Sequence, residues 1–486
     1  MKKTLLLSAL IGLLMTACQS TDVEPQMHDD ALKTSPAQEE NVQQITEDVN
    51  SGEVKNILGN LFGKQRKGRS TDYTVSLLKD KDGVDRIICI NYSDDGGFAL
   101  ISAEKTYEPI LAYSDKGNFD ISGELPFPLN EWMDCTMHSI ADSESLPADS
   151  LQKIANIWRK YDDLDYSKIS KSIKSPQRLP SIDWDTYYGL TRQMMDKMAE
   201  WKSNGYRVYS LDEYDGMTSI GDKDAIASYV QSRILPTYAE EYRSLALIVE
   251  KDISSTYGRG HWIYTEWDQA LDYNQSFEFV PGSTTEHIPV GCGPLAIGQI
   301  MYSYRYPNTF NWDAMTLTGF GNKTTSDFLL DVKEKCNAEY NPETGGTGCN
   351  QFQQMQALNH YGYTFQYTVP KNITEYNLVN YPAIISSHES WKTVTGKELD
   401  GDHAWIIEGG KCTHSRTDIE IWSFPYENFE CIHNESTEPD ETFIFYVNWG
   451  RSRGYQAYYS LASMIEDGHI SNSINSGLLG IKPNNQ

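Results

Sequence analysis

The sequence predicts an α+β protein, because helical and strand patterns occupy separate stretches of the chain. The stretch 294–304 carries apolar residues at helical spacing, and such spacing buries one face of a helix. Two short apolar runs follow later in the chain. The run 403–410 ends in Gly-Gly, and the run 443–448 is followed directly by Trp-Gly. Apolar runs of this length that are bounded by turn residues are typical of buried strands.

An earlier region has the pattern of a β-meander. The runs Tyr73–Leu78, Arg86–Asn91 and Phe98–Ser102 are separated by the turn steps Asp82-Gly83 and Asp95-Gly96. Asp-Gly steps supply the positive φ angles that tight turns need. We therefore expect a small domain with antiparallel strands ahead of the main domain.

Length and charge limit the possible partners. The 486 residues are enough for about three domains. The net charge of −27 argues against nucleic acid or an anionic membrane surface as a partner. With 22% charged and 12% aromatic residues the composition is that of a globular protein.

The N-terminus has the features of a secretory signal. Lysines at positions 2 and 3 precede the apolar stretch 5–17, and a basic start before a short apolar core is typical of such signals. Cys18 directly follows Thr-Ala and resembles a bacterial lipobox cysteine. We predict a lipoprotein signal peptide over 1–17 and a polar, flexible tether over 18–50. An ordinary signal peptide cleaved nearby is the alternative.

This N-terminus implies a place in the cell envelope. We expect the protein at the outer membrane or cell surface, held by a lipid anchor on Cys18, unless maturation releases it. The rest of the sequence contains no segment long and apolar enough to span a bilayer.

Cys292 is the first candidate functional residue. It stands between Gly291 and Gly293 at the start of the predicted helix, and Pro294 is tolerated in a first helical turn. The positive end of a helix dipole favours thiolate over thiol. The residue is either a nucleophile or a buried structural cysteine, and the presence of partners decides between the two.

Suitable partners follow later in the chain. A cysteine nucleophile needs a base and a group that orients the base. Among ten histidines, His403 begins the glycine-bounded apolar run, while Asn448 and Trp449 end the second one. An asparagine can fix the imidazole tautomer, and a tryptophan can shield that bond from water. The sequence thus predicts a site of Cys292, His403 and Asn448, with Trp449 beside it.

Together these motifs resemble the streptopain family of papain-like cysteine peptidases. The matching motifs are Gly291-Cys292, Gln299-Ile300-Met301, Tyr306-Pro307, Asn311-Trp312, His403-Ala404, Val447–Gly450 and Gly480–Pro483. The resemblance implies a papain-like two-lobe catalytic domain over 261–486, with Cys292 and His403 facing across a cleft. It also implies that the side chain of Gln269 belongs to the oxyanion hole, and that no metal or organic cofactor is required.

A second resemblance lies upstream. The segments 97–103 and 109–114, followed by Leu125–Pro128 and Trp132, are similar to the inhibitory pro-domain of that family. We therefore expect a small α+β pro-domain over 51–160 that acts as an intramolecular inhibitor. The implied protein is a monomeric endopeptidase, made as a zymogen, that hydrolyses protein or peptide substrates through a Cys-His acyl-enzyme.

Two other functions stay open: a catalytically silent papain-fold binding lipoprotein, and a related thiol amidase that acts on cell-wall peptides. Three features depart from the family pattern. Gly293-Pro294 follows the nucleophile, Arg451 stands where a second tryptophan is usual, and Asp402 precedes the histidine. An inward-pointing Asp402 carboxylate would raise the pKa of His403.

The least assigned stretch is 161–260, for which we expect a linker and a helical insertion with helices at 189–203 and 223–250. A second insertion between His403 and Asn448 forms a further hairpin. It contains two Cys-x-His triplets, at 412–414 and 431–433. In a cell-envelope protein we favour a Cys412–Cys431 disulfide over a metal site, and Cys336 and Cys349 are a second candidate pair.

Overall fold

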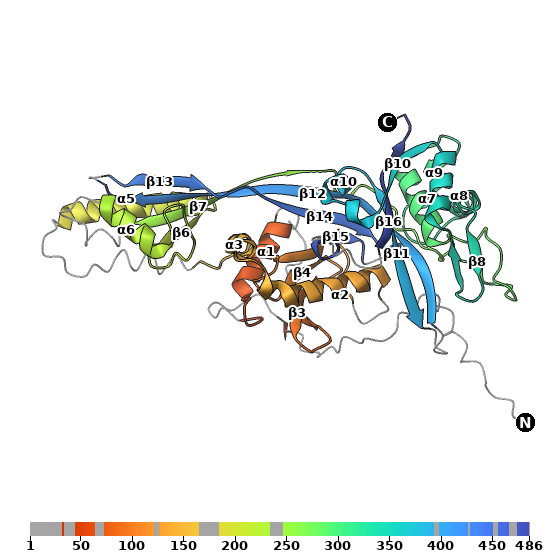
Figure 1. Ribbon diagram of the computed structural model, residues 1–486, viewed down its shortest axis with the longest axis horizontal. Helices are drawn as coiled ribbons and strands as arrows, with labels where there is room; N and C mark the ends of the chain where they lie inside the picture. The colour runs from red at the N-terminus through yellow and green to blue at the C-terminus, as the bar shows by residue number, and fades with distance from the viewer. Residues whose placement is uncertain are drawn as a thin grey trace, which may run out of the picture.

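One antiparallel sheet runs through most of the molecule in the computed structural model (Figure 1). Its strand order is β1-β2-β3-β4-β5-β15-β14-β12-β11-β16-β10; in addition, β7 and β13 pair with β12, and β6 pairs with β7. The structure describes residues 32–33, 44–63, 72–120, 125, 127–164, 184–233, 246–392, 398–425, 428–450, 455–465 and 474–485. Among these, no helix has the length and apolar character to cross a membrane. The predicted signal peptide and the lipid-anchor residue Cys18 lie outside the described residues.

The first sheet segment confirms the predicted meander. Its elements are β1 (Leu32–Lys33), α1 (Ser51–Phe62), β2 (Tyr73–Lys79), β3 (Asp85–Tyr92), β4 (Phe98–Ser102), β5 (Ile110–Ser114), α2 (Phe127–Asp142), η1 (Ser143–Ser145) and α3 (Ala148–Arg159). A capping box between Asn50 and Glu53 begins α1. Residues of α1 and α3 pack on one face of the meander, and residues of α2 pack on the other.

The helical lobe follows later in the chain. Its elements are α7 (Cys292–Tyr304), η3 (Trp312–Ala314), α8 (Lys323–Lys335), β8 (Glu339–Asn341), β9 (Gly346–Gly348) and α9 (Gln351–His360). They enclose a separate apolar core around Trp267, Ile297 and Phe328. Helix α7 is nearly all buried, which agrees with its apolar sequence.

The sheet lobe contains β10 (Tyr363–Thr368), η4 (Pro370–Asn372), α10 (Glu375–Leu378), β11 (Ala383–Lys392), β12 (Glu398–Ser423), β14 (Asp440–Asn448), β15 (Ala457–Tyr459), α11 (Ala462–Ile465) and β16 (Ile474–Pro483). Both predicted strands are present. His403 lies inside β12 rather than at its start, because the β11–β12 pairing extends five residues further, to Glu398. The α+β class, with a small domain ahead of a two-lobed domain, is thus confirmed.

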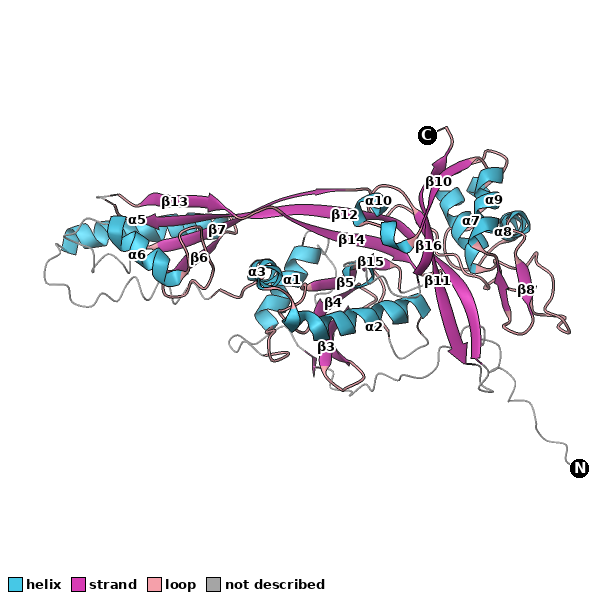
Figure 2. Cartoon of the chain, viewed as in Figure 1, coloured by secondary structure: helices cyan, strands magenta, loops and turns pink. Residues whose placement is uncertain are grey.

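The two insertions meet in one extended arm. The arm comprises α5 (Trp184–Ser203), β6 (Arg207–Ser210), α6 (Lys223–Arg233), β7 (Leu247–Tyr257), β13 (Glu430–Ser436) and the distal half of β12. Figure 2 shows its strands leading away from the sheet lobe to the two helices. Trp201, Ile248 and Ile421 share its core. The predicted helix 223–250 is wrong at its end, because residues from Leu247 onward form the strand β7 between β6 and β12.

The arm also explains why the predicted Cys412–Cys431 disulfide is wrong. Both cysteines are free. In the β12–β13 pairing, Cys431 lies directly opposite Trp422. That position is ten residues along β12 from Cys412, or about 30 Å at about 3.3 Å per residue. A disulfide needs Cα atoms within about 7 Å.

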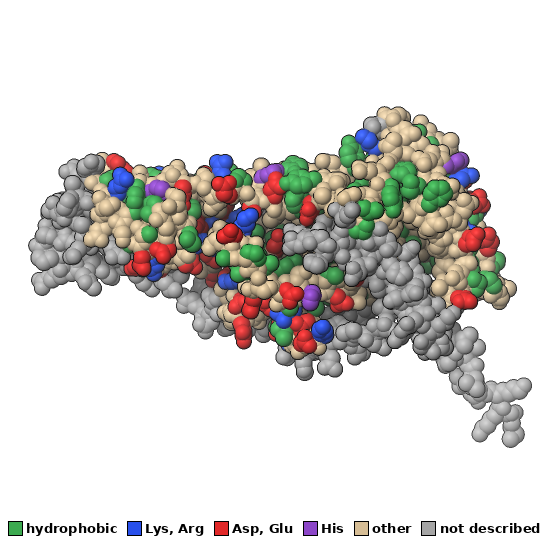
Figure 3. Space-filling view, in the orientation of Figure 1, with side chains coloured by type: hydrophobic (Ala, Val, Ile, Leu, Met, Phe, Trp, Pro, Cys, Tyr) green, Lys and Arg blue, Asp and Glu red, His purple; other side chains and the backbone are tan. Residues whose placement is uncertain are grey.

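The pro-domain predicted for residues 51–160 joins the sheet lobe through paired strands and a shared apolar core. Strand β5 pairs with β15, with Tyr113 opposite Tyr458. On α2, Trp132 packs edge-on against Tyr459 at 4.9 Å, and its Nε1 donates to the carbonyl of Ser460 at 2.7 Å. The apolar side chains of α2 and of the sheet lobe form one continuous core. Figure 3 shows acidic side chains over the pro-domain, on the face in view.

The arm is tied to the pro-domain by a buried ion cluster. The Glu250 carboxylate on β7 is 4% exposed. It accepts from Arg207 on β6 at 2.9 Å and from Arg159, the last residue of α3, at 2.6 Å. Each carboxylate oxygen thus has a guanidinium partner, which offsets the desolvation of the charges.

We predict that Trp132→Ala lowers the free energy of unfolding of the full chain by about 3–5 kcal/mol, because it empties a fully buried site in the shared core. Urea unfolding of a Cys292→Ala background measures this. Lys116→Ala is the control, because the Lys116–Glu266 ion pair between the same two domains is exposed and contributes at most about 1 kcal/mol. Equal effects of the two substitutions would contradict the shared core.

Candidate active site

Cys292 is the first residue of α7, as predicted. The turn before it depends on Gly291, whose φ of 94° favours glycine. A Cβ at Gly291 would lie 2.6 Å from the carbonyl oxygen of Thr347 on β9. The β8–β9 hairpin therefore packs directly against the turn before Cys292.

Gly293 allows a second close approach. A Cβ there would lie 2.6 Å from the sulfur of Cys349 and 3.0 Å from Nε2 of Gln354. The glycine after Cys292 therefore has a steric reason, since a larger residue would collide with the side chains of Cys349 and Gln354. Sequence reasoning gave Cys349 no role beside Cys292, because the two are 57 positions apart in the chain.

The sheet lobe meets α7 at Ala404. The backbone of Ala404, on β12, lies beside the sulfur of Cys292, and its N–H, together with those of Gly293 and Cys292, lowers the pKa of the thiol. His403 immediately precedes Ala404 and is 6% exposed. The structure thus brings the predicted nucleophile and the strand of the predicted base together across the two lobes.

The imidazole of His403 is held by main chain. Its Nε2 lies 3.0 Å from the carbonyl oxygen of Trp449. A carbonyl can only accept, so Nε2 carries the proton, and Nδ1 is the basic nitrogen of the neutral ring. The residue after Asn448 therefore supplies the contact that we predicted for the Asn448 side chain.

Asn448 itself belongs to a buried polar network. Its Nδ2 donates to Oε1 of Gln299 on α7 at 3.0 Å, and its Oδ1 accepts from the Gly450 N–H at 3.0 Å. The Thr265 hydroxyl donates to the same oxygen of Gln299 at 3.0 Å. Asn448, Gln299 and Thr265 are fully buried, so this network fixes α7 against the end of β14. Gln299 was noted in the sequence only as part of a matching motif.

Trp449 and Gln269 take their places around this centre. Trp449 is 1% exposed and packs against Trp405 and Tyr459, with ring centroids 4.9 Å and 5.2 Å away. The carbonyl of Gln269 accepts from the Val290 N–H at 2.9 Å, which anchors the loop of Gln269 beside the turn before Cys292. The side chains of Asp402 and Arg451, two departures from the family pattern, lie outside the described residues.

Burial, together with the neighbouring Cys349, raises the pKa of the Cys292 thiol to about 11. The three N–H donors to the sulfur act in the opposite direction but do not outweigh burial. The neighbouring thiol of Cys336, together with burial, raises the pKa of Cys349. Cys336 and Cys349 are both free, so the disulfide that we considered for this pair is not formed in the structure.

Comparisons with known proteins agree with the N-terminal part of this picture. Residues 43–140 match the family model described as Spi protease inhibitor, which confirms the resemblance to a streptopain-like pro-domain. Among solved structures, a fragment of prointerpain A from Prevotella intermedia is similar at 14% identity, over 84% of this chain and 98% of that chain, with a TM-score of 0.38. No curated protein matches the chain.

We predict that Gly293→Ala destabilises the chain by about 1–3 kcal/mol through overpacking against Cys349. Adding Cys349→Ala removes the colliding sulfur and should restore most of the loss, which a double-mutant cycle in urea measures. Gly348→Ala is the matched control, because a Cβ there meets nothing within 4 Å. Additive effects of Gly293→Ala and Cys349→Ala would contradict the close approach.

Proposed function

We propose that the protein is the zymogen of a papain-like cysteine endopeptidase. The observation that carries this proposal is the position of the Ala404 N–H, on β12, beside the sulfur of Cys292. It aligns the strand that holds a buried histidine with a cysteine at a helix N-terminus. A cysteine and a histidine supplied by facing lobes are the arrangement that thiol acyl transfer needs.

In the proposed reaction, Nδ1 of His403 takes the proton of Cys292, and the thiolate attacks the carbonyl carbon of a peptide bond. The developing oxyanion accepts from the Cys292 N–H and the Gln269 carboxamide. The imidazolium of His403 then protonates the leaving amine, which gives a thioester. Water then attacks the thioester with His403 as base, which releases the carboxylic acid product and regenerates the free thiol.

Each supporting residue has a separate part in this proposal. The carbonyl of Trp449 keeps the proton on Nε2 and leaves Nδ1 for catalysis. Asn448 holds the same segment through Gln299 and Gly450, so it orients His403 through the main chain. The indole of Trp449 is buried and keeps water from this contact.

The docked pro-domain supports a latent form. A continuous series of edge-to-face aromatic contacts runs from Trp132 of α2 through Tyr459 to Trp449, and the carbonyl of Trp449 holds His403. With a thiol pKa near 11, Cys292 is neutral at pH 7 and is a poor nucleophile in that state. We propose that removal of the pro-domain activates the enzyme, and that the chain is secreted and lipid-anchored through Cys18.

We expect the full chain to cleave an unstructured protein such as casein only after limited proteolysis releases the pro-domain. Cys292→Ala and His403→Ala should each abolish cleavage by the trimmed protein, by at least about a thousandfold. Cys431→Ala is the control for loss of an exposed free thiol and should retain full activity. Fluorescent casein hydrolysis is the measurement.

The same assay separates the two alternatives. A trimmed, folded protein that leaves casein intact but releases amino acids from cell-wall peptides would be a thiol amidase. A trimmed, folded protein that is inert towards both substrates would be a binding protein. Either outcome would contradict the endopeptidase.

A further inference from the structure

We propose that Cys412, His414 and Glu441 form a binding site for one zinc ion at the root of the arm. Cys412 and His414 are two residues apart on β12, and Glu441 lies directly opposite His414 on β14. Side chains at this spacing share one face of a sheet. This site is independent of the proposed peptidase function, because Cys412 is nine residues beyond His403 on the same strand, about 30 Å at about 3.3 Å per residue.

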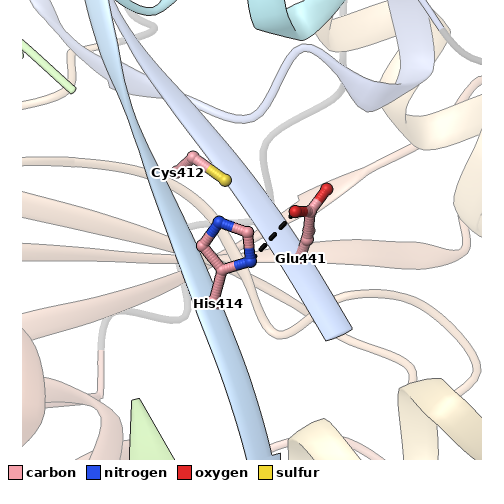
Figure 4. A group of neighbouring side chains, drawn as sticks. All are labelled: Cys412, His414 and Glu441. Carbon is pink, nitrogen blue, oxygen red and sulfur yellow. Dashed lines mark ion pairs between the residues drawn. The ribbon is translucent and has the colours of Figure 1, made fainter. Parts of the chain in front are cut away.

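The three side chains converge (Figure 4). One ligand atom from each, the Cys412 sulfur, an imidazole nitrogen of His414 and a carboxylate oxygen of Glu441, lies within 4.8 Å of the others. Nδ1 of His414 and Oε1 of Glu441 are 2.9 Å apart. Bonds of about 2.0–2.3 Å to a tetrahedral ion place ligand atoms about 3.5 Å apart, so small side-chain rotations are enough to close the site.

Two neighbouring tyrosines contact the proposed ligands. The hydroxyl of Tyr376, on α10, donates to the second carboxylate oxygen of Glu441. Tyr257 lies opposite Cys412 on β7, and its ring stacks on the imidazole of His414 with the ring centroids 5.2 Å apart. Such outer contacts fix ligand orientation in metal sites.

The donor set and its exposure indicate the kind of ion. One thiolate, one imidazole and one carboxylate are all ligands that zinc accepts, whereas calcium and magnesium prefer oxygen alone. Cys412 is buried, while the side chains of His414 and Glu441 are 41% and 30% exposed. The ion would therefore reach the site from solvent, and a water molecule would complete a four-coordinate shell.

The site would have a structural effect on the arm. Tyr257, Cys412 and Glu441 come from the three adjacent strands β7, β12 and β14. A bound ion would join β12 to β14 where β12 passes from the sheet lobe into the arm, with β7 held through Tyr257. Zinc should therefore raise the thermal midpoint of the full chain.

The test uses full-length protein in a Cys292→Ala background, so that the active-site thiol cannot bind metal. Titration with Zn²⁺ by calorimetry and with Co²⁺ by absorption should give one equivalent per chain, with a thiolate-to-cobalt charge-transfer band. Cys412→Ser and His414→Gln should each weaken binding at least tenfold, and the band should disappear in Cys412→Ser. Circular dichroism of the metal-free variants checks that they fold.

The matched control is Cys431→Ser. Cys431, His433 and Glu435 repeat the same residue types at alternate positions of β13, but the sulfur of Cys431 is hydrogen-bonded to the carbonyl of His433. Binding should be unchanged in this variant. Three results would each overturn the proposal. They are absence of binding, binding that survives Cys412→Ser (for example at Cys336 and Cys349), and loss of binding in Cys431→Ser.

Discussion

The contact between the Ala404 amide and the Cys292 sulfur is the interaction on which the site depends. It joins the first turn of α7, in the helical lobe, to β12, in the sheet lobe. The lobes are held in that register by the buried bridge from Gln299 on α7 to Asn448 at the end of β14. Breaking this bridge would leave buried amide groups unpaired, which costs more than the hydrogen bond itself contributes, so the bridge favours the observed register of the two lobes.

The pro-domain is built onto this arrangement rather than tethered beside it. Strand β5 extends the sheet at β15, and α2 fills the core beneath Tyr459 and Trp449. Sheet extension satisfies the edge of β15, and the shared core removes a large apolar face from water. The arm contributes to the same assembly, because Glu250 accepts from both Arg159 and Arg207. Removing the pro-domain therefore changes the surroundings of the histidine that Trp449 holds.

Local signals in the sequence were sufficient for much of this fold. Gly-Cys-Gly-Pro identified the start of α7, and Asp-Gly turns identified the meander, because each depends on a few neighbouring residues. Contacts set by strand register could not be predicted. The ten-residue offset between Cys412 and the partner of Cys431 excludes their disulfide, whereas the same register places Glu441 beside His414. The strand β7 was missed because its first residues, Leu247–Glu250, are buried between two strands and show no alternation.

The most direct measurement is the rate at which a peptide epoxide labels Cys292, with peptide mass spectrometry as the readout. The rate is measured as a function of pH, both before and after removal of the pro-domain. With the pro-domain docked, a thiol pKa near 11 predicts slow labelling at pH 7 that rises about tenfold per pH unit, because the thiolate fraction rises by that factor below the pKa. After removal, we expect fast labelling that is nearly constant from pH 6 to 8 and is lost in His403→Ala. A trimmed, folded protein whose Cys292 stays as slow as in the full chain would contradict the assignment of Cys292 as the nucleophile.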